Sequence, residues 1–241
     1  RLLERWLAQG YLPNLARFCE NGAFGDVRNV DYYRTETSWI TFLTGALPAQ
    51  TGEWGHVDYD PANYRTREHD SYAFRTYPPF YALLGDQRVA VFDPPLARLQ
   101  AGLNGVQVLG WGTEANQCLR TSQPAELIAE LIGRHGAHPM FEHALPEKNA
   151  AGAAVYSYSI PSSYDLPGLH DLRDRLVTAA HRRGAMMQDL LERDDWDLNL
   201  RVSTETHTAS HLLWHLSQQQ SRSTSHSWRY GIEATNNYND F

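Results

Sequence analysis

Short apolar runs alternate with amphipathic segments in the middle of this chain, and that order constrains the fold more than any other feature. Two runs, 88–95 (RVAVFDPP) and 105–112 (GVQVLGWG), have the length and valine content of buried strands. Segment 122–136 has helical periodicity, with a Ser at its start and a Gly at its end. A long helix is predicted over 165–193, and a further strand over 196–203 follows it directly. Strands that alternate with helices predict an α/β fold with a mainly parallel sheet.

The part of the chain before this region is less regular. Helices are predicted over 1–10 and 13–22, and residues 23–30 alternate as a strand would. Residues 46–64 are rich in turn formers and aromatic side chains, which predicts a loop with little regular structure.

Length and composition bound the domain organisation. A chain of 241 residues is long enough for one large α/β domain with a substantial core. We expect this domain to cover 1–216, with an insertion or cap over 113–165. The Ser-, Gln- and Asn-rich end has no periodicity, and it predicts an irregular or disordered tail over 217–241.

Charge and cysteine content restrict the partners and the compartment. The formal net charge of −7 argues against a nucleic-acid backbone as partner. No apolar run approaches a membrane span and no signal peptide opens the chain, so we expect no membrane partner. Cys19 and Cys118 are too few for a disulfide framework and are predicted to be reduced packing residues. These features favour a cytoplasmic protein, and the oligomeric state stays open.

The stretch 33–45, YRTETSWITFLTG, carries the first functional signal. A polar turn with Thr35 precedes an apolar run that predicts a buried helix, ended by Thr44-Gly45. A hydroxyl at such a helix start lies beside unpaired N–H groups and the positive end of the helix dipole, an arrangement that suits phosphate. The alternative is that Thr35 or Thr37 only caps the helix, since capping Thr is far commoner than nucleophilic Thr.

This stretch resembles the nucleophile segment of the alkaline phosphatase superfamily, most closely that of the type I phosphodiesterase/nucleotide pyrophosphatase group. In that group a Thr lies ten residues before the Gly of a Thr-Gly pair, so Gly45 sets the register and Thr35 takes the nucleophile's place. Thr37 falls where the group often has Pro, and Ser38 where some members have an Asn that contacts a phosphoryl oxygen. The resemblance implies an alkaline-phosphatase-like three-layer α/β/α fold with a mainly parallel sheet.

A second functional signal, STETHTASHLLWHL, follows the predicted strand over 196–203. His207, His211 and His215 are spaced at four, so on a helix they share one face. Two imidazoles at that spacing can hold one metal ion such as zinc. Surface or core histidines with other partners are the commoner explanation of such a spacing.

The segment Glu205–His211 resembles the E-P-D-x-x-G-H motif of the same group, whose Asp and His bind metal. His211 takes the place of the motif's His and His207 that of its Asp, while Ser210 replaces its Gly. A neutral imidazole in place of a carboxylate suits zinc better than magnesium. His215 has no counterpart among the ligands, which assigns it to the surroundings of the site or to the surface.

The resemblance implies hydrolysis of a small phosphoester or nucleotide-like substrate, most naturally a diester or a pyrophosphate, with two divalent metal ions, expected to be zinc. One ion is held in part by Thr35, whose Oγ attacks phosphorus to form a phospho-threonine. The other is held in part by His207 and His211. The N–H of Glu36 and the hydroxyl of Ser38 bind the equatorial oxygens.

The group also has ligands that this sequence does not match: an Asp at the end of the first strand, and later an Asp-His pair and a lone His. We therefore expect a sheet that is incomplete at both ends and a fragment that is inactive by itself.

Three alternatives stay open. The first is sulfate-ester or phosphonate hydrolysis, or phosphoryl-group transfer, on the same scaffold. The second is a non-catalytic remnant that binds an anion or a protein. The third is a structural α/β domain in which these Thr and His residues only cap and pack.

Overall fold

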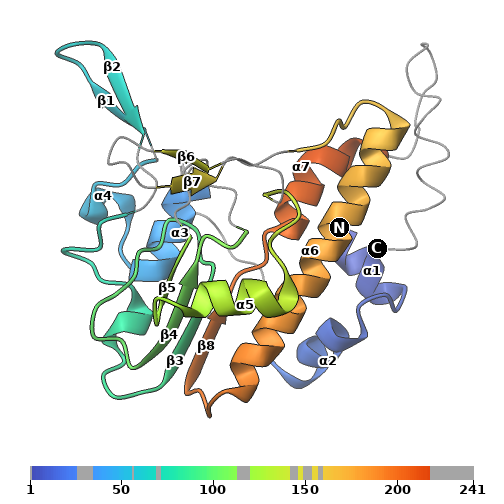
Figure 1. Cartoon of the computed structure of the whole chain (residues 1–241), viewed down its shortest axis with the longest axis horizontal. Coiled ribbons are helices and arrows are strands. Elements are labelled where there is room, and N and C mark those ends of the chain that lie inside the picture. The colour runs from blue at the N-terminus through green and yellow to red at the C-terminus, as the bar shows by residue number, and fades with distance from the viewer. Residues whose placement is uncertain are drawn as a thin grey trace. The chain divides into compact units, whose positions relative to one another are not determined.

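The computed structural model in Figure 1 describes residues 2–25, 35–55, 57–68, 72–112, 120–141, 146–148, 154–156 and 160–217. Contacts divide the chain into two compact units, Arg1–Tyr33 and Arg34–Phe241, each described here by itself. The predicted strand over 23–30 lies mostly outside the described residues, and so do Cys118 and the tail beyond 217.

The first unit contains two short helices, α1 (Leu2–Ala8) and α2 (Pro13–Asn21), as predicted from their apolar periodicity. Pro13 opens α2, where its missing N–H is not needed and its fixed φ fits the helix. Cys19 lies on α2, is half-buried and has a free thiol.

The second unit is built on a four-stranded sheet in the order β5-β4-β3-β8. These strands are β3 (Val89–Phe92), β4 (Gly105–Leu109), β5 (Thr121–Gln123) and β8 (Leu198–Arg201). β3 pairs in parallel with both β4 and β8, and β4 pairs antiparallel with β5. The predicted α/β class and mainly parallel sheet are therefore confirmed.

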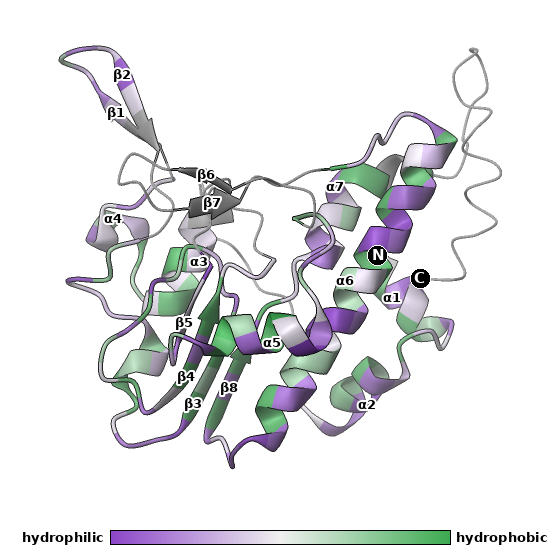
Figure 2. Ribbon diagram, viewed as in Figure 1, coloured by the Kyte–Doolittle hydropathy of each residue, from purple (hydrophilic) through white to green (hydrophobic). Residues whose placement is uncertain are grey.

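Helices cover both faces of this sheet (Figure 1). They are α3 (Thr35–Thr44), the 3-10 helix η1 (Phe80–Leu83), α5 (Leu127–His135) and α6 (Leu166–Glu192). Val89 and Val91 pack in a cluster with α3 and η1, whereas Phe92 and Val108 pack with α5 and α6. All residues of β3 are buried because both of its faces are covered, and its sequence is continuously apolar for the same reason (Figure 2).

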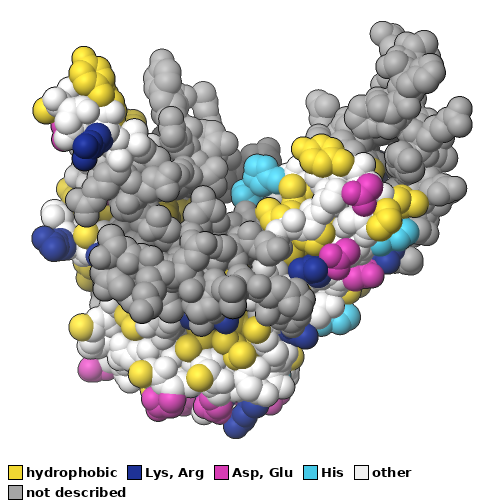
Figure 3. Space-filling model, turned by 45° about the horizontal axis from the view of Figure 1, so that its top comes forward, with side chains coloured by type: hydrophobic (Ala, Val, Ile, Leu, Met, Phe, Trp, Pro, Cys, Tyr) yellow, Lys and Arg dark blue, Asp and Glu magenta, His cyan; other side chains and the backbone are white. Residues whose placement is uncertain are grey.

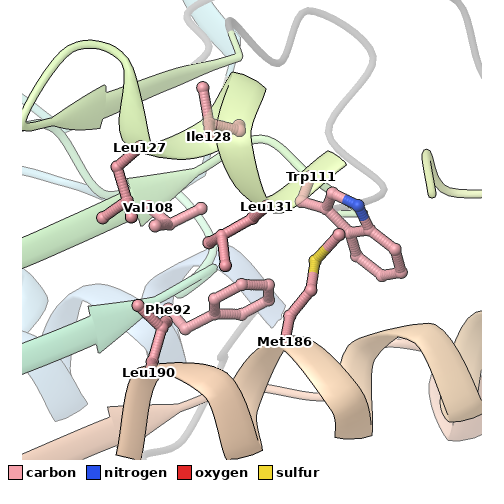
Figure 4. Packing of buried hydrophobic residues seen from close by; sticks show 8 residues of the cluster. All are labelled: Phe92, Val108, Trp111, Leu127, Ile128, Leu131, Met186 and Leu190. Atoms are coloured by element: carbon pink, nitrogen blue, oxygen red, sulfur yellow. The ribbon is translucent and has the colours of Figure 1, made fainter. Parts of the chain in front are cut away.

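The core between the sheet and the pair α5 and α6 is shown in Figure 4. Its buried members are Phe92, Val108, Trp111, Leu127, Ile128, Leu131, Met186 and Leu190. Leu131 points toward the ring of Phe92, between the strands and α6 (Figure 4). Full burial of one such side chain contributes about 1.5–3 kcal/mol relative to exposure, so this layer fixes α5 and α6 on the sheet.

The long helix predicted over 165–193 is observed as α6. Asp165 is its N-cap, and the Asp165 carboxylate accepts a hydrogen bond from the Gly168 N–H at 2.8 Å. One stripe of α6 is buried, at positions 169, 172, 176, 179, 183, 186 and 190. All of these residues are apolar except Arg183, and this exception leads to the functional site.

The prediction of an irregular segment over 46–64 is wrong. The short helix α4 (Pro48–Thr51) lies there, and β1 (Val57–Asp60) pairs antiparallel with β2 (Arg65–Glu68). The intervening turn is closed by Asp60, whose carboxylate accepts hydrogen bonds from the Ala62 N–H and the Asn63 amide. Asp and Asn close turns in this way, so polar residues that suggested a loop form a hairpin turn.

The start of the helix predicted over 122–136 also differs from expectation. α5 begins only at Leu127, and Ser122 lies in β5. The Ser122 hydroxyl still accepts a hydrogen bond from the Ile128 N–H at 2.9 Å, so it serves the helix start from the neighbouring strand. Within the expected insertion, the structure also describes the hairpin of β6 (Pro146–Lys148) and β7 (Ala154–Tyr156).

Over the described residues, none of the helices has the length and apolar character needed to cross a membrane.

Candidate active site

Helix α3 spans Thr35–Thr44, so Thr35 lies in its first turn, whereas the sequence predicted Thr35 in a polar turn just before the helix. The side chains of Thr35 and Glu36 lie outside what the structure describes. Gly45 follows the helix with a φ of 68°, and its N–H donates to the Thr41 carbonyl at 2.8 Å. A left-handed residue after the last turn is where Gly is favoured, so the Thr-Gly pair marks the helix end.

The other two polar residues of the first turn of α3 differ from each other. Thr37 is only 2% exposed, and its Oγ1 has no hydrogen-bond partner among the residues that the structure describes. Thr37 therefore packs inside the unit and does not cap the helix, which removes one of the two capping alternatives. Ser38 is half-buried on the next position of the same turn.

Helix α7 (Glu205–Ser217) carries the histidines. The rings of His207 and His211 are both exposed, their centroids lie 4.4 Å apart and their planes are inclined at 76°. The two imidazoles are therefore neighbours on one face, as their spacing predicts. The side chain of His215 lies outside the described residues. Ser210, in the place of the motif's Gly, donates its hydroxyl hydrogen bond to the His207 carbonyl at 2.8 Å.

A buried ion cluster lies where α6 passes the carboxyl ends of the parallel strands, and its centre is Arg183. The guanidinium donates from Nε to both Glu205 oxygens at 2.8 and 3.0 Å, and from Nη1 to Asp93 Oδ2 at 3.0 Å. It also donates to the Val202 carbonyl at 2.8 Å and to Thr204 Oγ1 at 3.1 Å. Asp93, Arg183 and Glu205, called here the ion cluster, are each at most 5% exposed.

Asp93 anchors the loop that follows β4. Its Oδ1 accepts the N–H groups of Gly110 and Trp111 at 2.8 and 3.1 Å, and its Oδ2 accepts the Gly112 N–H at 2.8 Å. Asp93 has a φ of 60°, an uncommon region for a residue with a side chain. The hydrogen bonds from this loop and from Arg183 compensate for that conformation.

His138 and Glu205 complete the polar interior. His138 Nδ1 accepts the Met140 N–H at 3.3 Å, so its proton lies on Nε2, which is 3.6 Å from Glu205 Oε1. Burial lowers the pKa of His138 although Glu205 acts against this, so the imidazole is neutral at pH 7. Burial would raise the pKa of Glu205, but His138, Arg183 and Ser203 together lower it to about 2.

The family model for type I phosphodiesterase / nucleotide pyrophosphatase matches residues 1–230. The chain belongs to this family. It is therefore a member of the alkaline phosphatase superfamily, and its α/β sheet with helices on both faces is consistent with an alkaline-phosphatase-like fold. No curated protein and no solved structure matches the chain.

Membership of the type I phosphodiesterase / nucleotide pyrophosphatase family supports a phosphoester hydrolase whose members typically depend on metal. Among the described residues, His207 and His211 are adjacent imidazoles, a side-chain type that can bind a metal ion. Within the part of the chain that the structure describes, no group of three or more His, Cys, Asp or Glu could hold a metal ion. The histidine pair by itself supplies two possible ligands, fewer than such a group.

The ion cluster was missed at the level of sequence, although two signals point to it. Arg183 interrupts the apolar stripe of α6, and a charged residue in such a stripe must be paired. Asp93 ends the apolar strand run just before Pro94 and Pro95. Glu205 stands in the first position of the metal motif, but its partner Arg183 is distant in sequence and only the fold brings them together.

Proposed function

We propose that this chain carries the nucleophile and part of the metal site of a phosphodiester or pyrophosphate hydrolase, in which Thr35 Oγ attacks phosphorus. The observation that carries the proposal is that α3 spans Thr35–Thr44 and is followed by Gly45, whose left-handed φ of 68° closes the helix. This is the register in which the family places its nucleophile.

The helix start supplies the binding of the phosphoryl group. The first N–H groups of a helix have no partner within it, and they point toward an anion together with the positive end of the dipole. The N–H of Glu36 and the hydroxyl of Ser38 donate to the equatorial oxygens, where negative charge grows during the attack. Thr35 Oγ displaces the leaving group in line and becomes a phospho-threonine, which water then hydrolyses.

The site would be completed by two divalent ions, which we propose to be zinc. Their chemistry would be to favour the deprotonated Thr35 hydroxyl and to stabilise the leaving oxygen. His207 and His211 would hold one ion with neutral imidazoles, and Thr35 would contribute to the other. The replacement of a carboxylate by His207 favours zinc over magnesium.

For the 241-residue chain itself, we propose weak zinc binding and little turnover. A catalytic zinc normally has three protein ligands, and the adjacent imidazoles of His207 and His211 are two. Without a metal ion, a Thr hydroxyl stays protonated at neutral pH and is a poor nucleophile.

The nucleophile is tested in an active protein that contains this chain, by hydrolysis of bis(p-nitrophenyl) phosphate. Thr35→Ala should abolish turnover and Thr35→Ser should retain part of it, since the hydroxyl survives. Thr44→Ala, at the other end of α3, is the matched control because Thr44 bonds only to nearby backbone of its own segment, at Ile40 and Ala46. Turnover by Thr35→Ala at the wild-type rate would exclude Thr35 as nucleophile.

The same assay separates the alternatives on this scaffold. Faster hydrolysis of p-nitrophenyl sulfate or of a phosphonate ester than of the phosphodiester would assign the scaffold to that reaction. Hydrolysis of none of them, with retained binding of inorganic phosphate, would support a non-catalytic anion-binding role.

A further inference from the structure

The ion cluster includes Glu205, the first residue of the helix that carries the histidine pair. We propose that Glu205, held by Arg183, is a positioning residue that fixes the first turn of α7 and thereby keeps His207 and His211 in the geometry that binds a metal ion. This inference rests on the proposed metal role of the two histidines, and it assigns a function to buried charges outside the metal motif's ligands.

The guanidinium of Arg183 fastens the ends of three parallel strands to α6. It bonds to Asp93 after β3, and through Asp93 to the loop Gly110–Gly112 after β4. It bonds to the Val202 carbonyl and the Thr204 hydroxyl after β8. Thr204 in turn donates to the Gly112 carbonyl at 2.5 Å, which ties the segment before α7 to the β4 loop.

Glu205 extends this fastening into α7, because it is the first residue of that helix. Both of its carboxylate oxygens are held, by Arg183 Nε and by the Ser203 hydroxyl at 2.7 Å. Each helical residue turns the chain by about 100° and advances it by about 1.5 Å. A slip of one residue in the first turn would therefore rotate His207 and His211 away from their present face.

The guanidinium is closely packed by the β4 loop and by aromatic rings. A Cβ on Gly112 would lie 2.5 Å from Arg183 Nη2 and 2.6 Å from His138 Cδ2. The guanidinium also lies over two aromatic rings. Its central carbon is 4.9 Å from the centroid of the Trp111 ring and 5.5 Å from the centroid of the Phe92 ring. The ion cluster is thus buried and closely packed at the start of α7, whereas the two histidines that we propose it positions are exposed.

The test compares two substitutions of Glu205 in the 241-residue chain. Glu205→Ala removes every contact to Arg183 and Ser203, whereas Glu205→Gln keeps the shape and an acceptor for Arg183 Nε. Zinc affinity is measured by NMR titration of the His207 and His211 imidazoles, and the Thr208 amide reports the first turn, since it donates to the Thr204 carbonyl at 3.0 Å. Asp189→Asn is the control, because it removes ion pairs of α6 with Arg193 and with His135 of α5, neither of which lies in α7.

Loss of a group that orients metal ligands typically costs about 10–100-fold in metal affinity. We expect Glu205→Ala to weaken zinc binding by at least about 10-fold and to accelerate exchange of the Thr208 amide, with Glu205→Gln and Asp189→Asn within about 3-fold of wild type. Equal affinity of Glu205→Ala and wild type would overturn the proposal. An equal loss in Glu205→Ala and Glu205→Gln would also overturn it, because that result assigns the effect to charge.

Two further outcomes also decide the proposal. If Glu205→Ala does not fold, Glu205→Asp replaces it, since a side chain shorter by one methylene cannot keep its bond to Arg183 without moving the turn. Wild-type affinity of Glu205→Asp would then overturn the positioning role. If zinc leaves both imidazoles of the wild-type chain unperturbed, the proposed metal site itself fails, and the positioning role fails with it.

Discussion

Replacement of Arg183 by Met probes the buried ion cluster most strongly. Arg183→Met keeps the length of an apolar stem and leaves the carboxylates of Asp93 and Glu205 buried without their shared cation. Breaking a buried ion pair from one side costs about 3–5 kcal/mol. We expect a cost at the lower end of this range, because both carboxylates keep other partners. Asp93 still accepts hydrogen bonds from the N–H groups of the β4 loop, and Glu205 still contacts Ser203 and His138.

The pKa of Glu205 gives the direction in which this contribution depends on pH. The folded protein holds this carboxyl at about 2, against an ordinary value of 4.5. Since one pKa unit corresponds to about 1.4 kcal/mol, the environment stabilises the carboxylate by about 3 kcal/mol. That stability is present above the ordinary pKa and is lost as the pH falls toward 2. From the lower end of the cost of breaking a buried ion pair, we expect Arg183→Met to lower the free energy of unfolding by about 3 kcal/mol at pH 7.

The sign of the pH dependence distinguishes this explanation from lost packing. In Arg183→Met the buried Glu205 has lost its cation, so its pKa rises from the wild-type value, although His138 and Ser203 still act to lower it. The folded variant then takes up a proton as the pH falls, and the wild type loses its own advantage over the same range. The difference in unfolding free energy between the two proteins should therefore shrink between pH 7 and pH 4.

Urea unfolding followed by tryptophan fluorescence measures the effect at pH 7 and at pH 4.5. Arg173→Met is the matched control on α6, since Arg173 pairs only with the exposed Asp174 at the surface, and exposed pairs contribute about 0–1 kcal/mol. A loss below about 1 kcal/mol for Arg183→Met at pH 7 would refute the argument. So would a larger loss that is the same at both pH values.

Further substitutions test the packing around the site, each by urea unfolding. Leu131→Ala, at a fully buried position between α5 and the sheet, should cost about 2–5 kcal/mol, and a loss under 1 would contradict the described core. Gly112→Ala should destabilise the chain and expose Trp111, because the added methyl group would clash with Arg183 and His138. Wild-type stability of this variant would contradict the close packing around Gly112. Thr37→Val should be neutral or stabilising, since the buried Thr37 hydroxyl has no partner, and a clear loss would reveal one.

The sequence predicted those parts of the fold in which one local signal decides the structure. The run Val89–Phe92 is continuously apolar and is the central strand, and α6 has both a capping Asp165 and a regular apolar stripe. The β1–β2 hairpin was missed because its turn depends on hydrogen bonds of Asp60, which composition does not distinguish from a loop. The late start of α5 was missed because Ser122 reaches the helix from a neighbouring strand.

For the candidate site, the sequence predicted arrangements within one segment but not contacts between distant segments. The positions of Thr35 at a helix start and of His207 next to His211 follow from spacing within one segment. The joining of Asp93, Arg183 and Glu205 depends on three segments far apart in the sequence, and periodicity could show only that Arg183 lies on a buried stripe. Whether Thr35 shares one site with the histidine pair stays a prediction. Figure 3, in which the top of Figure 1 is turned forward, shows histidine side chains at the surface.

The most direct test of the account is a crystal structure of the chain grown with zinc and orthovanadate, with anomalous scattering recorded at the zinc edge. The account predicts a zinc peak bound by the imidazoles of His207 and His211, and vanadate at the start of α3 within bonding reach of Thr35 Oγ. A zinc peak at these imidazoles with vanadate elsewhere, or zinc bound away from both histidines, would contradict the claim that α3 and α7 form one phosphoester site.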